Sequence, residues 1–137
     1  MKLNFALLLL IVLFSFSLLK ANTLEKNQSI YLIRHALAPG NGDPINFDLL
    51  DCSTQRNLND VGILQSKEIG QFFSKNNIKI DDVYSSQWCR CKDTASYAFN
   101  NFKELNFLNS FYSYPFNLNK DEQMRDLRTF ISELEYK

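Results

Sequence analysis

Short apolar runs alternate with amphipathic stretches along residues 30–137 of the chain. Residues 30–34, Ile-Tyr-Leu-Ile-Arg, form a β-prone run between polar neighbours, which is typical of a buried strand. Residues 79–85 alternate toward a second strand, and residues 105–108 predict a short third strand. Each run is followed by a stretch with helical periodicity, so the order predicts an α/β protein with a largely parallel sheet.

Three stretches carry apolar side chains at the spacing of an α-helix: residues 60–75, 88–101 and 121–135. Asn59 is placed as the N-cap of the first helix. In such a layered sheet, ligands bind at the carboxyl ends of the strands. The loop of residues 36–58 is long for a compact domain, and a loop of that length is usually functional.

The N-terminal residues have a different character. Lys2 precedes an apolar run from Phe5 to Leu19, which is short for a membrane span and typical of a secretory signal peptide. We therefore predict a signal peptide over residues 1–21 and a periplasmic or secreted protein. The alternative is an uncleaved membrane anchor formed by residues 3–19. A polar linker, residues 22–29, precedes the predicted domain.

Charge and cysteine content narrow the choice of partners. The 137 residues contain 15 basic and 15 acidic side chains, and a formal charge of zero argues against nucleic acid. In an oxidising compartment, Cys52 is expected to pair with Cys89 or with Cys91, since the latter two are too close to favour each other. One histidine and a Cys-X-Cys cannot supply four zinc ligands, so no metal or cofactor is predicted.

The candidate chemistry gathers where two predicted strands end. Arg34 and His35 follow the first strand, and Arg90 lies about one helical turn beyond Ser85-Ser86. If these strands are neighbours, Arg90 reaches the same pocket as Arg34, and two guanidiniums make a strong clamp for an anion. Their charges should keep His35, the only histidine, neutral and nucleophilic.

Three ordered segments strengthen this interpretation. Residues 30–36 end in Arg-His-Ala, residues 57–66 read Asn-Leu-Asn-Asp-Val-Gly-Ile-Leu-Gln-Ser, and residues 85–95 read Ser-Ser-Gln-Trp-Cys-Arg-Cys-Lys-Asp-Thr-Ala. They resemble the Arg-His-Gly, Leu-Thr-x-x-Gly-x-x-Gln-Ala and Ser-Ser-x-x-x-Arg-x-x-x-Thr-Ala segments of the histidine phosphatase superfamily, the phosphoglycerate mutase-like enzymes. Residues 40–44 and 51–56 suggest a bacterial exported subgroup.

The resemblance implies a three-layer α/β domain that hydrolyses a small phosphomonoester through a phosphohistidine, without a metal. His35 would be the nucleophile, while Arg34 and Arg90 would hold the phosphoryl oxygens. Asn41 lies six residues after His35, where some members place a phosphate-contacting asparagine. Arg56 is a further candidate substrate contact, although an exposed loop arginine is the simpler interpretation.

The sequence also departs from the superfamily pattern. The family uses a second histidine on a late strand and a carboxylate proton donor, and neither is found where expected. We therefore expect residues 30–137 to be a partial domain, truncated at its C-terminal end, with weak or lost turnover.

Two further functions remain open. A non-catalytic module could bind phosphate or another anion without turnover. A thiol-based redox protein could use Cys89 or Cys91, if the charge of Arg90 lowered the pKa of a nearby thiol.

Overall fold

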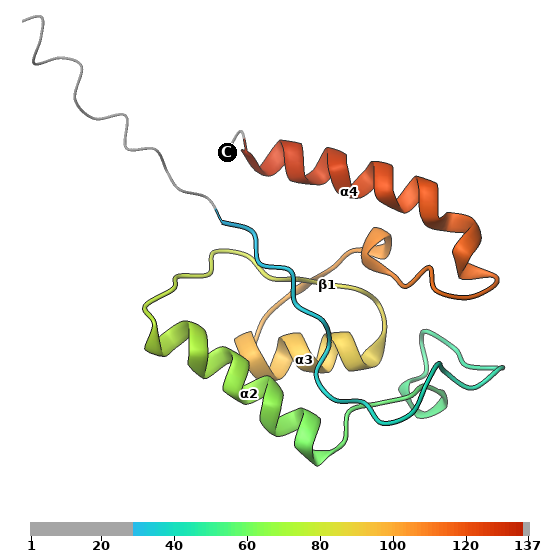
Figure 1. The fold of residues 1–137 in the computed structure, drawn as a ribbon, viewed down its shortest axis with the longest axis horizontal. Helices are drawn as coiled ribbons and strands as arrows, with labels where there is room; N and C mark the ends of the chain where they lie inside the picture. The colour runs from blue at the N-terminus through green and yellow to red at the C-terminus, as the bar shows by residue number, and fades with distance from the viewer. Residues whose placement is uncertain (1–28, 136–137) are drawn as a thin grey trace, which may run out of the picture. The chain divides into compact units, whose positions relative to one another are not determined.

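The computed structural model describes residues 29–135 and divides the chain into two units, residues 1–31 and 32–137. The helices and the strand labelled in Figure 1 all belong to the second unit. The predicted signal peptide, the alternative anchor and all but the last residue of the predicted linker lie outside the described residues. Within residues 29–135, no helix has both the length and the apolar character needed to cross a membrane.

The three predicted helices are confirmed. They are α2 (Asp60–Lys75), α3 (Cys89–Phe99) and α4 (Lys120–Glu135). Asn59 is the N-cap of α2, and its side chain accepts a hydrogen bond from the Gly62 backbone N–H at 2.9 Å. This bond satisfies one of the backbone donors that the first turn of a helix leaves without a partner.

The described sheet is smaller than the predicted one. Strands β1 (Tyr84–Ser85) and β2 (Lys103–Glu104) run parallel, and Tyr84 lies opposite Lys103. Only the end of the predicted strand 79–85 is therefore a strand, and the prediction for residues 105–108 is wrong, because a 3₁₀ helix (Asn106–Leu108) occupies that position. Two parallel strands with three helices are consistent with an α/β fold, but they do not establish three layers.

The prediction of a buried strand at residues 30–34 is also wrong. These residues form no strand, and the side chains of Leu32 and Ile33 are 84% and 45% exposed. A β-prone sequence becomes a strand only when another strand supplies its hydrogen bonds. In the described part of the chain, that pairing forms between β1 and β2 instead.

Helices α2 and α3 lie side by side (Figure 1). Gly70 makes this approach possible, because a Cβ atom at that position would lie 2.1 Å from the carbonyl oxygen of Ala98. Next to this contact, the buried ring of Phe73 meets Phe99 edge to face, with 5.4 Å between ring centroids. Helices α2 and α3 are thus packed closely against each other.

Two further contacts fix the long loop to the start of α3. A disulfide joins Cys52, in a short 3₁₀ helix (Cys52–Thr54), to Cys89, the first residue of α3. The ring of Trp88 packs against Phe47 and Phe116, at centroid distances of 5.7 and 5.2 Å, and these two rings also contact each other at 5.6 Å. Phe116 belongs to a last 3₁₀ helix (Phe116–Asn119). The loop is thus held against the body of the protein at several points.

Candidate functional site

The segment after His35 is held by both α2 and α3. The backbone N–H of Ala36 donates to the Thr94 hydroxyl at 3.0 Å, and that of Leu37 donates to Gln65 Oε1 at 2.9 Å. The Leu37 carbonyl in turn accepts from the Asn59 N–H at 3.4 Å. These contacts come from the second and third motif segments of the sequence, so those motifs serve to position the residues beside His35.

Gly62 brings the start of α2 against this segment. A Cβ atom at position 62 would lie 2.1 Å from the carbonyl oxygen of Leu37, well inside van der Waals contact. Only glycine fits there without a shift of the backbone. The glycine of the second motif is therefore explained by packing.

The hydrogen bonding of His35 defines its tautomer. Its Nδ1 lies 2.7 Å from the carbonyl oxygen of Ala36. Since a carbonyl oxygen can only accept, Nδ1 must carry the hydrogen, and the neutral ring then has its lone pair on Nε2. The geometry thus leaves Nε2 as the nucleophilic atom.

Burial lowers the pKa of the half-buried His35 below its usual 6.5. The hydrogen bond to Ala36 opposes this effect, while the positive charges of Arg90, Arg56 and Arg34 add to it. The direction agrees with the expectation from the sequence, since a low-dielectric surrounding and nearby cations both disfavour the imidazolium ion. His35 is thereby held in its neutral form near neutral pH.

His35 lines a cavity of about 740 Å³ together with Arg34 and Arg56. Apolar side chains of Leu37, Val61 and Leu64 form part of the lining. The lining also includes one carboxylate, that of Glu68. The cavity therefore combines a nucleophile, two cations, one anion and an apolar surface, and its cationic side chains suit an anionic group attached to a less polar body.

Arg56 is more enclosed than the sequence suggested. Its Nε donates to the Gly42 carbonyl at 2.9 Å, and its Nη1 donates to the Ala38 carbonyl. Gly40 and Gly42 have positive φ angles of 93° and 69°, a conformation that glycine adopts without strain. These two glycines thus let the loop backbone wrap around the Arg56 side chain.

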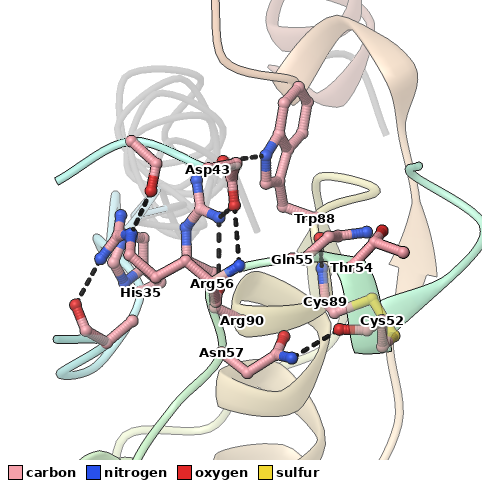
Figure 2. Close-up of polar contacts among 12 residues, drawn as sticks. His35, Asp43, Cys52, Thr54, Gln55, Arg56, Asn57, Trp88, Cys89 and Arg90 are labelled. Carbon is pink, nitrogen blue, oxygen red and sulfur yellow. Dashed lines mark hydrogen bonds and ion pairs between the residues drawn. A yellow bond between two sulfur atoms is a disulfide. The ribbon is translucent and has the colours of Figure 1, made fainter. Parts of the chain in front are cut away.

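Arg90 is placed differently from Arg34. It is 7% exposed, and its Nη1 donates to Asp43 Oδ1 at 2.8 Å and to the Arg56 carbonyl at 3.4 Å (Figure 2). It acts electrostatically on His35, but it is not among the residues that line the cavity. The structure therefore brings Arg34 and Arg56 to the cavity wall, with Arg90 buried beside them.

Asp43 is a functional candidate that the sequence did not single out. Its carboxylate accepts hydrogen bonds from Arg90, from the Trp88 indole N–H at 2.9 Å and from the Arg56 backbone N–H at 3.0 Å. Burial would raise its pKa, but these hydrogen bonds outweigh burial and hold the pKa below the usual value. Asp43 lies 47 residues from Arg90, so only the folded chain reveals this pair.

Asn41, the remaining candidate for a phosphate contact, lies away from the cavity. It is exposed and is not one of the residues that line the cavity.

The structure settles the pairing of the cysteines. Of the two pairings left open for Cys52, the structure has the one with Cys89, and Cys91 is free. Burial raises the pKa of the Cys91 thiol, which is opposite to the low pKa that a redox role would require.

Comparison with known proteins completes the description of the site. No group of three or more side chains suited to a metal ion occurs among the described residues. A search of the curated proteins and a search of the solved structures each found no match. A family model of the histidine phosphatase superfamily (branch 1) matches residues 30–108, more than half of the chain. This match includes Arg34, His35, Arg56 and Arg90, and it shows that the chain belongs to the histidine phosphatase superfamily.

Proposed function

We propose that this protein transfers a phosphoryl group from a small phosphomonoester to His35 and then to water. Membership of the superfamily indicates phosphoryl transfer in general, and the family typically binds small phosphorylated substrates. One observation carries the finer proposal. The 2.7 Å contact between His35 Nδ1 and the Ala36 carbonyl leaves Nε2 unprotonated in a cavity that Arg34 and Arg56 line.

The chemistry follows from these groups. The Nε2 lone pair attacks phosphorus, the bond from phosphorus to the leaving oxygen breaks, and that oxygen takes a proton from solvent. Water then attacks the phosphohistidine, which releases phosphate and restores the neutral imidazole. Arg34 and Arg56 offset the negative charge of the phosphoryl oxygens as it builds up.

A labelling experiment tests the proposal. The protein is incubated with radiolabelled p-nitrophenyl phosphate or phosphoramidate and denatured in alkali. We expect a label that is stable in base and lost in acid, and that maps to His35. The label should be absent in His35→Asn and retained in Cys91→Ser, which changes the free thiol. A wild-type protein that hydrolyses these donors while never becoming labelled would refute the phosphohistidine.

A second candidate is an anion-binding module without turnover. The arrangement of three arginines around His35 favours it, since cations alone can bind phosphate whether or not His35 reacts. Isothermal titration with inorganic phosphate separates the two functions. The module predicts binding that is weakened in Arg56→Gln and unchanged in His35→Asn, together with an unlabelled protein.

We also propose that the protein functions outside the cytoplasm, in the periplasm or secreted. The disulfide between Cys52 and Cys89 supports this location, since such bonds persist in oxidising compartments. The apolar run from Phe5 to Leu19 supports it as well. Cell fractionation and N-terminal sequencing test the proposal, and an uncleaved protein in the cytoplasmic fraction would contradict it.

A further inference from the structure

The carboxylate of Asp43 is fixed from three directions. Its Oδ1 accepts from Arg90 Nη1 at 2.8 Å and from the Arg56 N–H at 3.0 Å, while its Oδ2 accepts from the Trp88 indole at 2.9 Å. Figure 2 shows the carboxylate between these donors. The side chain is 7% exposed. An acceptor held by three donors in a buried position has little freedom to move.

The indole that holds Asp43 is itself immobilised. Trp88 is 2% exposed, and its ring packs against Phe47 and Phe116. The Arg90 guanidinium lies 5.9 Å from the centroid of the same ring. Trp88 therefore supports both members of the Asp43–Arg90 ion pair, by a hydrogen bond to one and by a cation–π contact with the other.

Arg90 is bound on one side only. Both hydrogen bonds that it makes in the described part of the chain use Nη1. Its Nε is buried and has no hydrogen-bond partner there. A buried donor without a partner costs free energy, and binding a ligand is one way in which such a donor gains a partner. The adjacent Nε and Nη2 atoms form the fork that suits two oxygens of one phosphoryl group.

We propose that Asp43 is a positioning residue that holds Arg90 through Nη1 beside the cavity, and that it leaves the Nε–Nη2 edge of the guanidinium free to bind phosphoryl oxygens next to His35. The inference rests on the phosphate-binding part of the proposed function. It gives Asp43 no part in proton transfer. Both of its oxygens accept hydrogen bonds, so the carboxylate is engaged as an anion and has no proton to donate.

Asp43 also relieves repulsion between cations. Burial lowers the pKa of Arg56, and the nearby charge of Arg90 lowers it further, while the charge of Asp43 opposes both effects. Without the carboxylate, Arg56 and Arg90 would face each other with no anion between them. Asp43 thus allows two guanidiniums to lie close to His35 before an anionic substrate arrives.

A double-mutant cycle on Asp43 and Arg90 tests this role, with inorganic phosphate and orthovanadate as ligands in calorimetric titrations. Asp43→Asn keeps the size of the side chain but removes its charge and turns one acceptor into a donor. We expect it to weaken binding about 10- to 100-fold, the range for loss of one charge-assisted contact. In an Arg90→Ala background, Asp43→Asn should cause little further loss, because the residue it positions is gone.

Two variants keep the experiment decisive. Asp48→Asn makes the same charge change at an exposed position of the same loop, and its binding should equal that of the wild type. If Asp43→Asn does not fold, Trp88→Phe removes one donor to the carboxylate and should give a smaller loss that also disappears with Arg90→Ala.

The possible outcomes separate the two proposals. Losses from Asp43→Asn and Arg90→Ala that simply add would overturn the positioning role, since a merely structural defect does not depend on Arg90. Unchanged binding in Asp43→Asn would overturn it as well. If Asp43→Asn weakens binding only when Arg90 is present, and His35 is never labelled, the positioning role stands and only the phosphoryl transfer is rejected.

Discussion

Reducing the disulfide between Cys52 and Cys89 should destabilise the protein strongly. The two cysteines are 37 residues apart, so the bond closes a loop that contains Arg56 and all of α2. In the chain-entropy treatment, opening a loop of this length returns about 4 kcal/mol of conformational entropy to the unfolded state. Domains are typically stable by only about 5–15 kcal/mol, so the loss is a large fraction of the total.

Urea unfolding followed by far-UV circular dichroism measures this effect. With an m-value of about 1.5 kcal/mol per molar, a loss of about 4 kcal/mol lowers the midpoint by about 2–3 M. Oxidised protein is compared with protein reduced by a phosphine, and with Cys52→Ser. Cys91→Ser serves as the matched control because Cys91 is outside the disulfide.

A midpoint that falls by less than about 0.5 M on reduction would refute this reasoning. It would mean that other contacts already confine the loop in the unfolded chain, or that the bond strains the folded protein. The hydrogen bond from the Cys89 N–H to Gln55 Oε1, at 3.0 Å, is the contact to examine next in that case.

Three further changes test other features of the site. The acid limb of kcat/KM should lie below pH 6.5, because the lowered pKa of His35 keeps its imidazole neutral there. Arg56→Gln removes a nearby positive charge and should therefore move this limb to higher pH. The contribution of His35 to the free energy of unfolding is complete above pH 6.5 and is lost as the pH falls through the lowered pKa. Gly62→Ala should lower the free energy of unfolding by about 1–3 kcal/mol through overpacking, which urea titration measures. Gly42→Ala is its counterpart in open space, where only the positive φ costs about 1–2 kcal/mol, and a larger loss there than at Gly62 would contradict the packing argument. Thr94→Val removes the acceptor of the buried N–H after His35 and should cost about 1–3 kcal/mol in the same titration, whereas Thr94→Ser should cost much less.

The helices could be predicted because their signals are local. The apolar spacing of residues 60–75 and the cap at Asn59 act within one element, and α2 has the predicted bounds. The first strand could not be predicted in the same way. The run at residues 30–34 has the right residue types, but whether it forms a strand depends on a partner elsewhere in the chain.

The site shows the same division. Arg34, His35 and Arg90 could be proposed as site residues because each lies in a short motif. Asp43 was not found, because an aspartate in a glycine-rich loop is typical of a turn, and its partner Arg90 is 47 residues away. Arg56 was only a secondary candidate for a substrate contact, because the carbonyls that hold it belong to a backbone path that no residue pattern specifies.

The two glycines of α2 make that helix a spacer of fixed length. Gly62 meets the carbonyl of Leu37 and Gly70 meets that of Ala98, so neither position can carry a side chain without a shift of the backbone. Eight residues of α-helix correspond to a rise of about 12 Å, and each residue turns the helix by about 100°. Inserting or deleting a single residue between the glycines would therefore turn one of them away from its carbonyl. We expect relatives to vary freely at the exposed positions of this helix while keeping the number of residues between Gly62 and Gly70.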